Sequence, residues 1–112
     1  MVKSKKYKFD ESSRQVADIA KALSHPARVA ILKYLAHTKT CISGDISNEI
    51  PLSRTTVSQH LKELRDAGLI HGEIEGLKIN YCLCHNNIEK CRKIFTDFLT
   101  EIDIDMDCKT EC

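Results

Sequence analysis

Cysteine is the residue type with the widest chemistry in this sequence, with six among the 112 residues. Cys82 and Cys84 form a C-x-C pair on an expected strand, where side chains two residues apart leave the same face. Cys108 and Cys112 would share a face if the segment DCKTEC became helical. Paired thiolates bind zinc-like, copper(I)-like or trivalent arsenic species in preference to hard cations. The same thiols could instead form a disulfide or persulfide, or be tolerated as free thiols in a reducing compartment.

A second unusual segment is PLSRTTVSQHLKEL, residues 51–64. Val57, Leu61 and Leu64 recur at helical spacing, so one narrow stripe of this helix is expected to be buried. The remaining surface carries hydroxyls, an amide and basic groups, where an ordinary solvated helix more often carries Glu–Lys pairs. Such groups can hydrogen-bond to base edges in the major groove of DNA, and the positive end of a helix suits phosphate.

Length and charge limit the classes of partner. We expect one domain over residues 1–112, with residues 1–10 as a basic N-terminal extension and residues 103–112 as an acidic tail that carries two cysteines. Residues 101–112 have a net charge of −4, which leaves +5 for residues 1–100. A modestly basic body of this kind permits a polyanionic partner.

Other classes are disfavoured by what the sequence lacks. No run approaches the roughly 20 apolar residues of a membrane span. The N-terminal MVKSKKYKF has no apolar signal-peptide core, so we expect a cytoplasmic protein without a membrane partner. The acidic residues are scattered along helices or gathered in the tail, and no nucleophile motif is present, so we do not expect an enzyme.

Hydrophobic spacing predicts a mainly α protein with a small β-hairpin. The expected helices cover residues 11–23, 24–35, 44–50, 53–67 and 86–102, a brief strand covers 39–43, and the hairpin strands cover 70–75 and 77–83. Ser24 and Ser53 are expected N-caps of the second and fourth helices, and Gly68 is expected at a left-handed C′ position.

The last expected helix carries a helix-packing seam. Its apolar residues are spaced 3, 4, 3 and 4 apart: Ile88, Cys91, Phe95, Phe98 and Ile102. Earlier in the chain, residues 44–50, the turn at 51–52 and residues 53–67 form an expected helix-turn-helix, with the hairpin as a wing. The second helix of such a motif enters the major groove with its N-terminus first.

Three segments resemble a known family. LSHPARVAILKYL at 23–35, LSRTTVSQHLKELRDAGLI at 52–70 and GEIEGLKINYCL at 72–83 resemble the ArsR/SmtB winged helix-turn-helix repressors, over about residues 14–102. The resemblance implies a homodimer joined through its first and last helices that represses by binding inverted-repeat operators in double-stranded DNA. DNA binding then needs no cofactor, and many members leave DNA when a metal or metalloid binds. For this chain the number and pairing of the cysteines lead us to expect a thiophilic inducer, with trivalent arsenic first.

The expected DNA-binding residues are Arg54, Thr55, Thr56, Ser58, Gln59, Lys62 and Lys78. We assign Thr55, Ser58 and Gln59 to base edges and the others to phosphates, which position a protein without carrying sequence information. Lys78 is equally well interpreted as a solvated hairpin lysine.

Two further polar residues near this motif have open roles. His60 is at least as well explained by packing or capping as by DNA contact. Arg28 could meet a phosphate or an acidic partner, and the sequence does not decide between them.

In a winged helix, the short strand before the third helix usually pairs with the second hairpin strand, which would bring Cys41 near Cys82 or Cys84. The candidate metal ligands are therefore Cys41, Cys82, Cys84, Cys108 and Cys112. Cys91 is expected to be a small packing residue of the seam.

The sequence departs from the family's familiar ligand sets. Arsenic-sensing members often carry C-x-C-x-x-C at the start of the third helix, where this chain reads CISGDIS. Zinc-sensing members place Asp and His ligands along the last helix, and residues 86–102 contain no histidine. Two alternatives stay open: a thiol-based redox switch on the same fold without metal, and a winged-helix module that binds protein instead of DNA.

Overall fold

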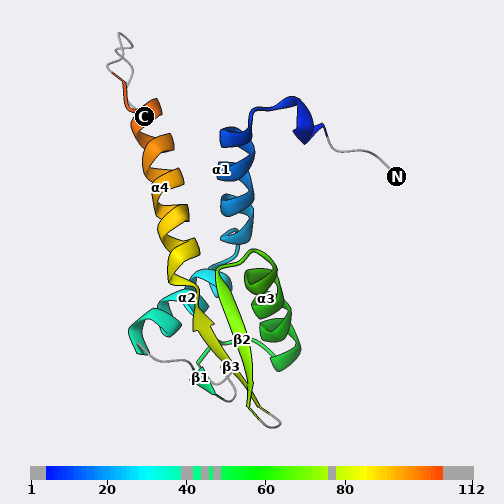
Figure 1. The fold of residues 1–112 in the computed structure, drawn as a ribbon. Helices are drawn as coiled ribbons and strands as arrows, with labels where there is room; N and C mark the ends of the chain where they lie inside the picture. Colours follow the sequence, from blue (N-terminus) through cyan, green and yellow to red (C-terminus); the bar gives the residue numbers. More distant parts are fainter. Residues whose placement is uncertain (1–4, 39–41, 44–45, 47–48, 76–77, 105–112) are drawn as a thin grey trace.

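The computed structural model describes residues 5–38, 42–43, 46, 49–75 and 78–104. Its elements, in chain order, are η1 (Lys6–Lys8), α1 (Glu11–Ala22), α2 (Pro26–Thr38), β1 (Ile42–Ser43), α3 (Arg54–Asp66), β2 (Ile70–Glu75), β3 (Lys78–Leu83) and α4 (His85–Ile102) (Figure 1). The expected mainly α fold with a small hairpin is confirmed. Within the described ranges, no helix is long and apolar enough to cross a membrane.

One residue at each end determines where α3 begins and where it ends. The Ser53 side chain accepts a hydrogen bond from the backbone N–H of Thr56 at 3.2 Å, as expected of an N-cap. At the other end, Gly68 has a φ of 80°, a left-handed conformation that glycine adopts without steric cost. These two residues fix the length of α3 and therefore which of its side chains lie at its start.

The N-cap expected at Ser24 is wrong. The Ser24 hydroxyl donates to the carbonyl oxygen of Lys21 at 2.7 Å, because the last carbonyls of α1 lack partners within the helix. The next residue, His25, caps α2 instead: its Nδ1 accepts from the backbone N–H of Ala27 at 3.0 Å. The helix then runs to Thr38, three residues beyond the expected end at Leu35.

The sheet is antiparallel with strand order β1-β3-β2. Ile42 of β1 lies opposite Tyr81, and Ile70 of β2 lies opposite Leu83. The expected pairing of the short strand with the second hairpin strand is therefore confirmed. On β2, a Cβ at Gly72 would come within 2.9 Å of Ile79 Cγ2, so the close approach of the two strands favours glycine there.

The segment expected to form the third helix is described only at Ile46, Glu49 and Ile50. The backbone N–H of Glu49 donates to the carbonyl of Ile46 at 2.9 Å, which is a single turn, and both isoleucines are buried. The other residues of 44–50, and 39–41 of the expected strand, lie outside the described residues.

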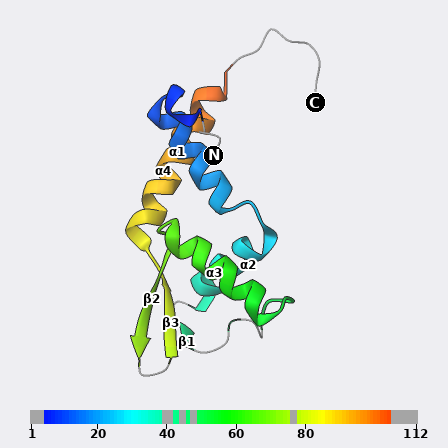
Figure 2. The same ribbon diagram turned by 90° about the vertical axis from the view of Figure 1, so that its right-hand side faces the viewer.

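The core lies where α2, α3 and the start of β2 meet, and its fully buried large side chains are Ile31, Leu64 and Ile70. α1 and α4 extend side by side away from this body, as the two views show (Figures 1 and 2). Although α4 has 18 residues, none of its side chains is fully buried. The body thus holds α3 and the hairpin, and the helix pair leaves an apolar seam uncovered.

Candidate nucleic-acid interface

The outward face of α3 is set by its buried stripe. Val57, Leu61 and Leu64 belong to the core cluster, so the opposite face points away from the body. Five of the residues expected to contact DNA are exposed on α3: Arg54, Thr55, Ser58, Gln59 and Lys62. The first turn contains no acidic residue, so the positive end of the helix is not compensated locally. This surface can receive the base edges and phosphates of a duplex.

Thr56 has a second role beside its expected phosphate contact. It is half-buried, and its Oγ1 lies 2.9 Å from Ser53 Oγ, where either hydroxyl can donate. Its hydroxyl therefore supports the cap of α3. Lys78 begins β3 opposite Glu75, at the end of the hairpin remote from α4 (Figure 1), and its side chain lies outside the described part of the structure.

His60 and Arg28 have structural partners that the sequence did not reveal. His60 is only 9% exposed, which agrees with its interpretation as a packing residue. Arg28 Nε donates to His60 Nδ1 at 3.2 Å, and its Nη1 donates to the carbonyls of Lys21 at 3.2 Å and Ala22 at 3.3 Å. These contacts add a structural role for Arg28 that the sequence did not suggest, and the phosphate contact and the acidic partner stay predictions.

A signal for His60 was present in the helix period. His60 lies three residues after Val57 and four before Leu64, which places it on the buried face. Burial lowers the pKa of His60, and the neighbouring His25 and Arg28 lower it further, whereas Glu63 acts in the opposite direction. No comparable signal pointed to Arg28, because its partner on α3 is 32 residues away in the sequence.

The described cysteines differ in oxidation and in exposure. Cys82 is only 6% exposed and is disulfide-bonded, whereas Cys84 and Cys91 are free thiols with partial exposure. Cys84 lies one residue beyond the end of β3 and precedes α4, so the expected C-x-C pair spans a strand end and a helix start. Burial raises the pKa of the Cys91 thiol, which packs against the core as expected.

The other candidate ligands, Cys41, Cys108 and Cys112, lie outside the described residues. Among the residues that the structure does describe, no group of three or more His, Cys, Asp or Glu side chains is placed to hold a metal ion.

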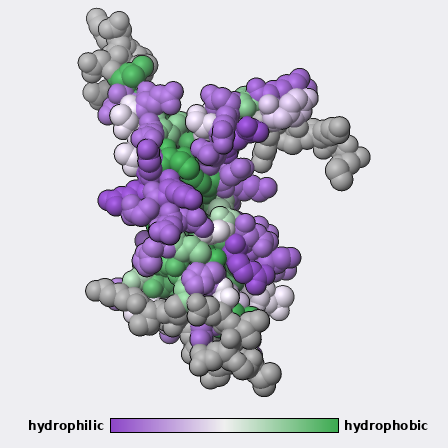
Figure 3. Space-filling view, in the orientation of Figure 1, coloured by the Kyte–Doolittle hydropathy of each residue, from purple (hydrophilic) through white to green (hydrophobic). Residues whose placement is uncertain are grey.

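The seam between α1 and α4 is open. A groove of about 450 Å³ runs between the two helices, and its lining includes Val16, Ile94 and Phe98. Leu99 and Ile102 of α4 are each 57% exposed. In the space-filling view a hydrophobic strip is visible between the two helices, bordered by hydrophilic side chains (Figure 3). This uncovered apolar surface coincides with part of the expected packing seam, because Phe98 and Ile102 belong to both.

Comparisons with known proteins agree with this geometry. A family model described as a helix-turn-helix domain matches residues 23–73, which include α2 and α3. The chain is also similar to the HTH-type transcriptional regulator YgaV of Escherichia coli K12, with 36% identity over 72 residues, covering 64% of this chain and 73% of that protein.

Two solved structures share the fold. An ArsR-like transcriptional regulator from Rhodococcus sp. RHA1 superposes with a TM-score of 0.66 at 23% identity, covering 84% of this chain and 88% of that one. The cadmium metal-sensor CmtR from Mycobacterium tuberculosis superposes with a TM-score of 0.53 at 28% identity, covering 87% of this chain and 95% of that one.

Proposed function

Because this chain belongs to the ArsR/SmtB family of winged helix-turn-helix transcriptional regulators, we propose that it represses transcription by binding a two-fold-symmetric operator as a homodimer. Like its relatives, the chain is a DNA-binding transcriptional regulator and not an enzyme. A regulator of this kind must reach its operator, so we propose the cytoplasm as its location.

The observation that carries the proposal is the exposed polar face of α3. Ser58 and Gln59 lie outward near the helix start, and together with Thr55 they offer short hydroxyls and an amide to base edges. Arg54 and Lys62 flank them as phosphate contacts. We further propose that Thr56 and Lys78 of the wing add phosphate contacts.

A homodimer is supported by the uncovered seam. α4 has no fully buried side chain in a single copy, and large apolar side chains such as Leu99 remain exposed along it. A second copy packed on α1 and α4 would cover this surface. One recognition helix reads too few bases to select a site in a genome, and a two-fold dimer doubles the number read.

Selection from a random pool of double-stranded DNA tests the proposal. We expect enrichment of an inverted repeat whose half-sites lie about one helical turn apart, bound by two protomers in sedimentation analysis. Enrichment of an asymmetric site bound by one protomer would rule out the dimeric arrangement. If no sequence is enriched and binding to the pool is negligible, the winged-helix fold serves protein binding here instead.

For the signal that releases DNA, we propose thiol chemistry at the hairpin. The inducer we place first is a thiophilic ion such as trivalent arsenic, held by Cys41, Cys82 and Cys84, with Cys108 and Cys112 as the competing pair. That a similar protein is a cadmium metal-sensor supports this class of signal. The described thiols alone do not fit such an ion, because Cys82 is disulfide-bonded and only Cys84 among the proposed ligands is a described free thiol.

The disulfide at Cys82 favours a second candidate, a redox switch without metal. Ile42 pairs with Tyr81, and Cys41 and Cys82 are the next residues along these antiparallel strands. Continuing the register by one residue would pair the two cysteines, so we propose Cys41, which lies outside the described residues, as the partner thiol. A two-electron oxidant such as a peroxide would accept the two electrons and two protons of the thiols, and the resulting disulfide would lock β1 to β3 beside the helix-turn-helix.

A further inference from the structure

Two imidazoles meet where the turn between α1 and α2 approaches α3. The ring centroids of His25 and His60 are 4.3 Å apart, with the rings tilted by 40°. Each ring uses Nδ1 as an acceptor: His25 accepts from the N–H of Ala27, and His60 accepts from Nε of Arg28. A neutral imidazole has one acceptor nitrogen and a protonated imidazole has none, so both bonds require neutral rings.

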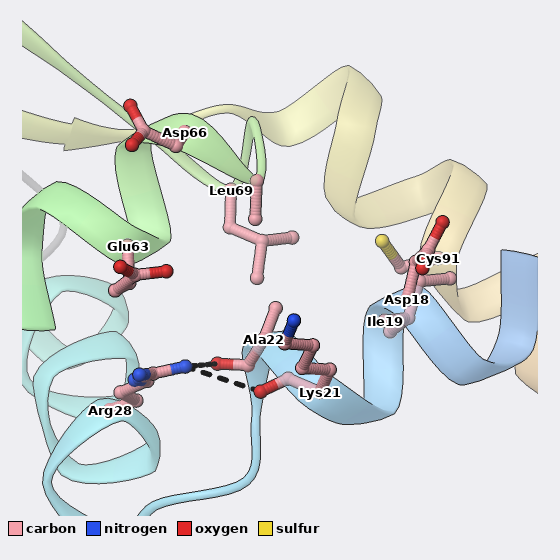
Figure 4. Close-up of a pocket in the computed structure, with 10 residues that line it drawn as sticks. Asp18, Ile19, Lys21, Ala22, Arg28, Glu63, Asp66, Leu69 and Cys91 are labelled. Carbon is pink, nitrogen blue, oxygen red and sulfur yellow. Dashed lines mark hydrogen bonds between the residues drawn. The ribbon is translucent and has the colours of Figure 1, made fainter. Parts of the chain in front are cut away.

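Arg28 extends this contact to α1. While its Nε is bound to His60, its Nη1 donates to the carbonyls of Lys21 and Ala22 at the end of α1 (Figure 4). Those carbonyls have no partner within the helix, so the guanidinium adds a donor for each of them, and the Lys21 carbonyl also accepts from the backbone N–H and the hydroxyl of Ser24. One planar side chain of α2 thus connects the last turn of α1 to the middle of the recognition helix α3.

We propose that Arg28, His25 and His60 form a proton-sensitive tie that holds α3 in its DNA-binding orientation, so that acid weakens operator binding. This inference rests on the proposed function. Proton uptake by His60 removes the acceptor for Arg28 Nε and places a positive ring beside a guanidinium. Because α1 belongs to the proposed dimer contact, loosening the tie changes how the recognition helix is presented to the operator.

The charges around the tie support this direction. His60 faces His25 and Arg28, both of which oppose a positive ring, and Glu63 of its own helix, which favours one. Burial is the largest cause that lowers the pKa of His60, so the ring is neutral near neutral pH. A cavity of about 410 Å³ beside Arg28 is lined by charged side chains of α1 and α3 (Figure 4). They are Asp18, Lys21, Glu63 and Asp66. A released guanidinium therefore has carboxylates of α3 to move toward.

The test measures operator affinity by fluorescence anisotropy between about pH 7.5 and about pH 5.5, the range over which histidines titrate. For the wild-type protein we expect affinity to fall as pH is lowered, by no more than about tenfold at pH 5.5, because one proton taken up by a ring whose pKa lies below 6.5 cannot give a larger effect. His60→Asn keeps an acceptor near the position of Nδ1 but takes up no proton, so its affinity should stay nearly constant. The control His37→Asn removes an exposed histidine of α2 and should behave as wild type. An undiminished acid effect in His60→Asn would overturn the proposal.

A measurement on the free wild-type protein covers the case in which the variant does not fold. In an NMR titration, the Arg28 Nε–H resonance should shift with the same midpoint as the His60 ring. An Arg28 resonance that ignores the titration of His60 would also overturn the proposal. If the two resonances titrate together but the protein binds no DNA at any pH, the tie stands and the proposed function fails.

Discussion

Asn87 Nδ2 donates a 2.7 Å hydrogen bond to the carbonyl oxygen of Gly68, which joins the first turn of α4 to the residue that ends α3. Gly68 has its left-handed φ of 80° at this point. A Cβ there would lie 3.1 Å from Asn87 Nδ2, so the contact is close as well as directional. The recognition helix is therefore tied to α4 at its end and, through Arg28, to α1 at its middle.

Replacing Asn87 with Ala should lower the free energy of unfolding by about 0.5–1.5 kcal/mol, the usual net contribution of one hydrogen bond. It should also weaken operator binding, because α4 no longer fixes the end of α3. Urea unfolding and DNA titration would measure the two effects. The matched control is Asn86→Ala, which removes an exposed amide from the adjacent position. Equal behaviour of the two variants would show that the bond contributes nothing.

Gln59→Ala and Lys62→Ala should affect DNA binding differently. Loss of a base contact at Gln59 should cost roughly 1–3 kcal/mol on the operator and relax sequence preference. Loss of a phosphate contact at Lys62 should weaken binding to all sequences alike and flatten the salt dependence. Arg65→Ala removes an equal charge from the last turn of the same helix and should leave the salt dependence unchanged. Wild-type binding by both test variants would mean that α3 does not enter the groove.

Phe98→Glu should abolish the proposed dimer. Phe98 is half-buried and lines the groove between α1 and α4, so a partner that covers this groove would bury an unpaired carboxylate. We expect monomers or unfolded protein in sedimentation velocity, and no operator binding in either case. Thr96→Glu adds the same charge at an exposed position of α4 and should remain dimeric. A stable dimer of Phe98→Glu would place the interface elsewhere.

Two paired serine variants should identify the sensing thiols. One replaces Cys82 and Cys84, and the other replaces Cys108 and Cys112. The pair whose loss keeps the protein on operator DNA in the presence of arsenite holds the inducer. Cys91→Ser serves as the control, since that thiol packs against the core and its raised pKa disfavours the thiolate.

Mass spectrometry under non-denaturing conditions separates the two kinds of thiol signal. Uptake of an ion adds its own mass, whereas a disulfide lowers the mass by two hydrogens. Normal DNA release by both paired variants, with no uptake by the wild type, would refute the metalloid proposal and leave the redox switch.

Stability should depend on pH through His60. Its folded-state pKa lies below the ordinary value of 6.5, so the unfolded chain binds more protons in the window between the two values. The free energy of unfolding therefore rises with pH across that window, and this stability is lost as pH falls below about 6.5. Urea unfolding at several pH values should show the slope in wild type and a smaller slope in His60→Asn. An identical slope in both proteins would show that groups other than His60 cause the pH dependence of the free energy of unfolding.

Local sequence signals predicted most of the fold. Helical spacing and the residues at its ends located α3, because Ser53 and Gly68 act through contacts within a few residues. The prediction failed at Ser24 because two helix ends compete for one hydroxyl there, and that hydroxyl donates to the carbonyl of Lys21 at the end of α1. Whether a hydroxyl in such a turn caps the second helix or donates to the end of the first depends on the geometry of both helices. Residue spacing alone does not determine that geometry.

The exposed polar face of α3 was predictable for a related reason. Exposed residues such as Gln59 are identified by exclusion from the buried stripe, which is a property of one helix. The connections behind that surface were not predictable. Arg28 meets His60 across 32 residues and Asn87 meets Gly68 across 19, and only the packed fold brings these partners together.

The uncovered length of α4 has a consequence for how the protein responds to its own abundance. If a second copy is what shields this helix, then association supplies part of the stability of each chain, and the folded population depends on protomer concentration. Operator occupancy would then rise steeply, close to the square of the amount synthesised, instead of in proportion to it. Growth and division, which dilute the protein, would lift repression abruptly below a threshold copy number, even with no inducer present.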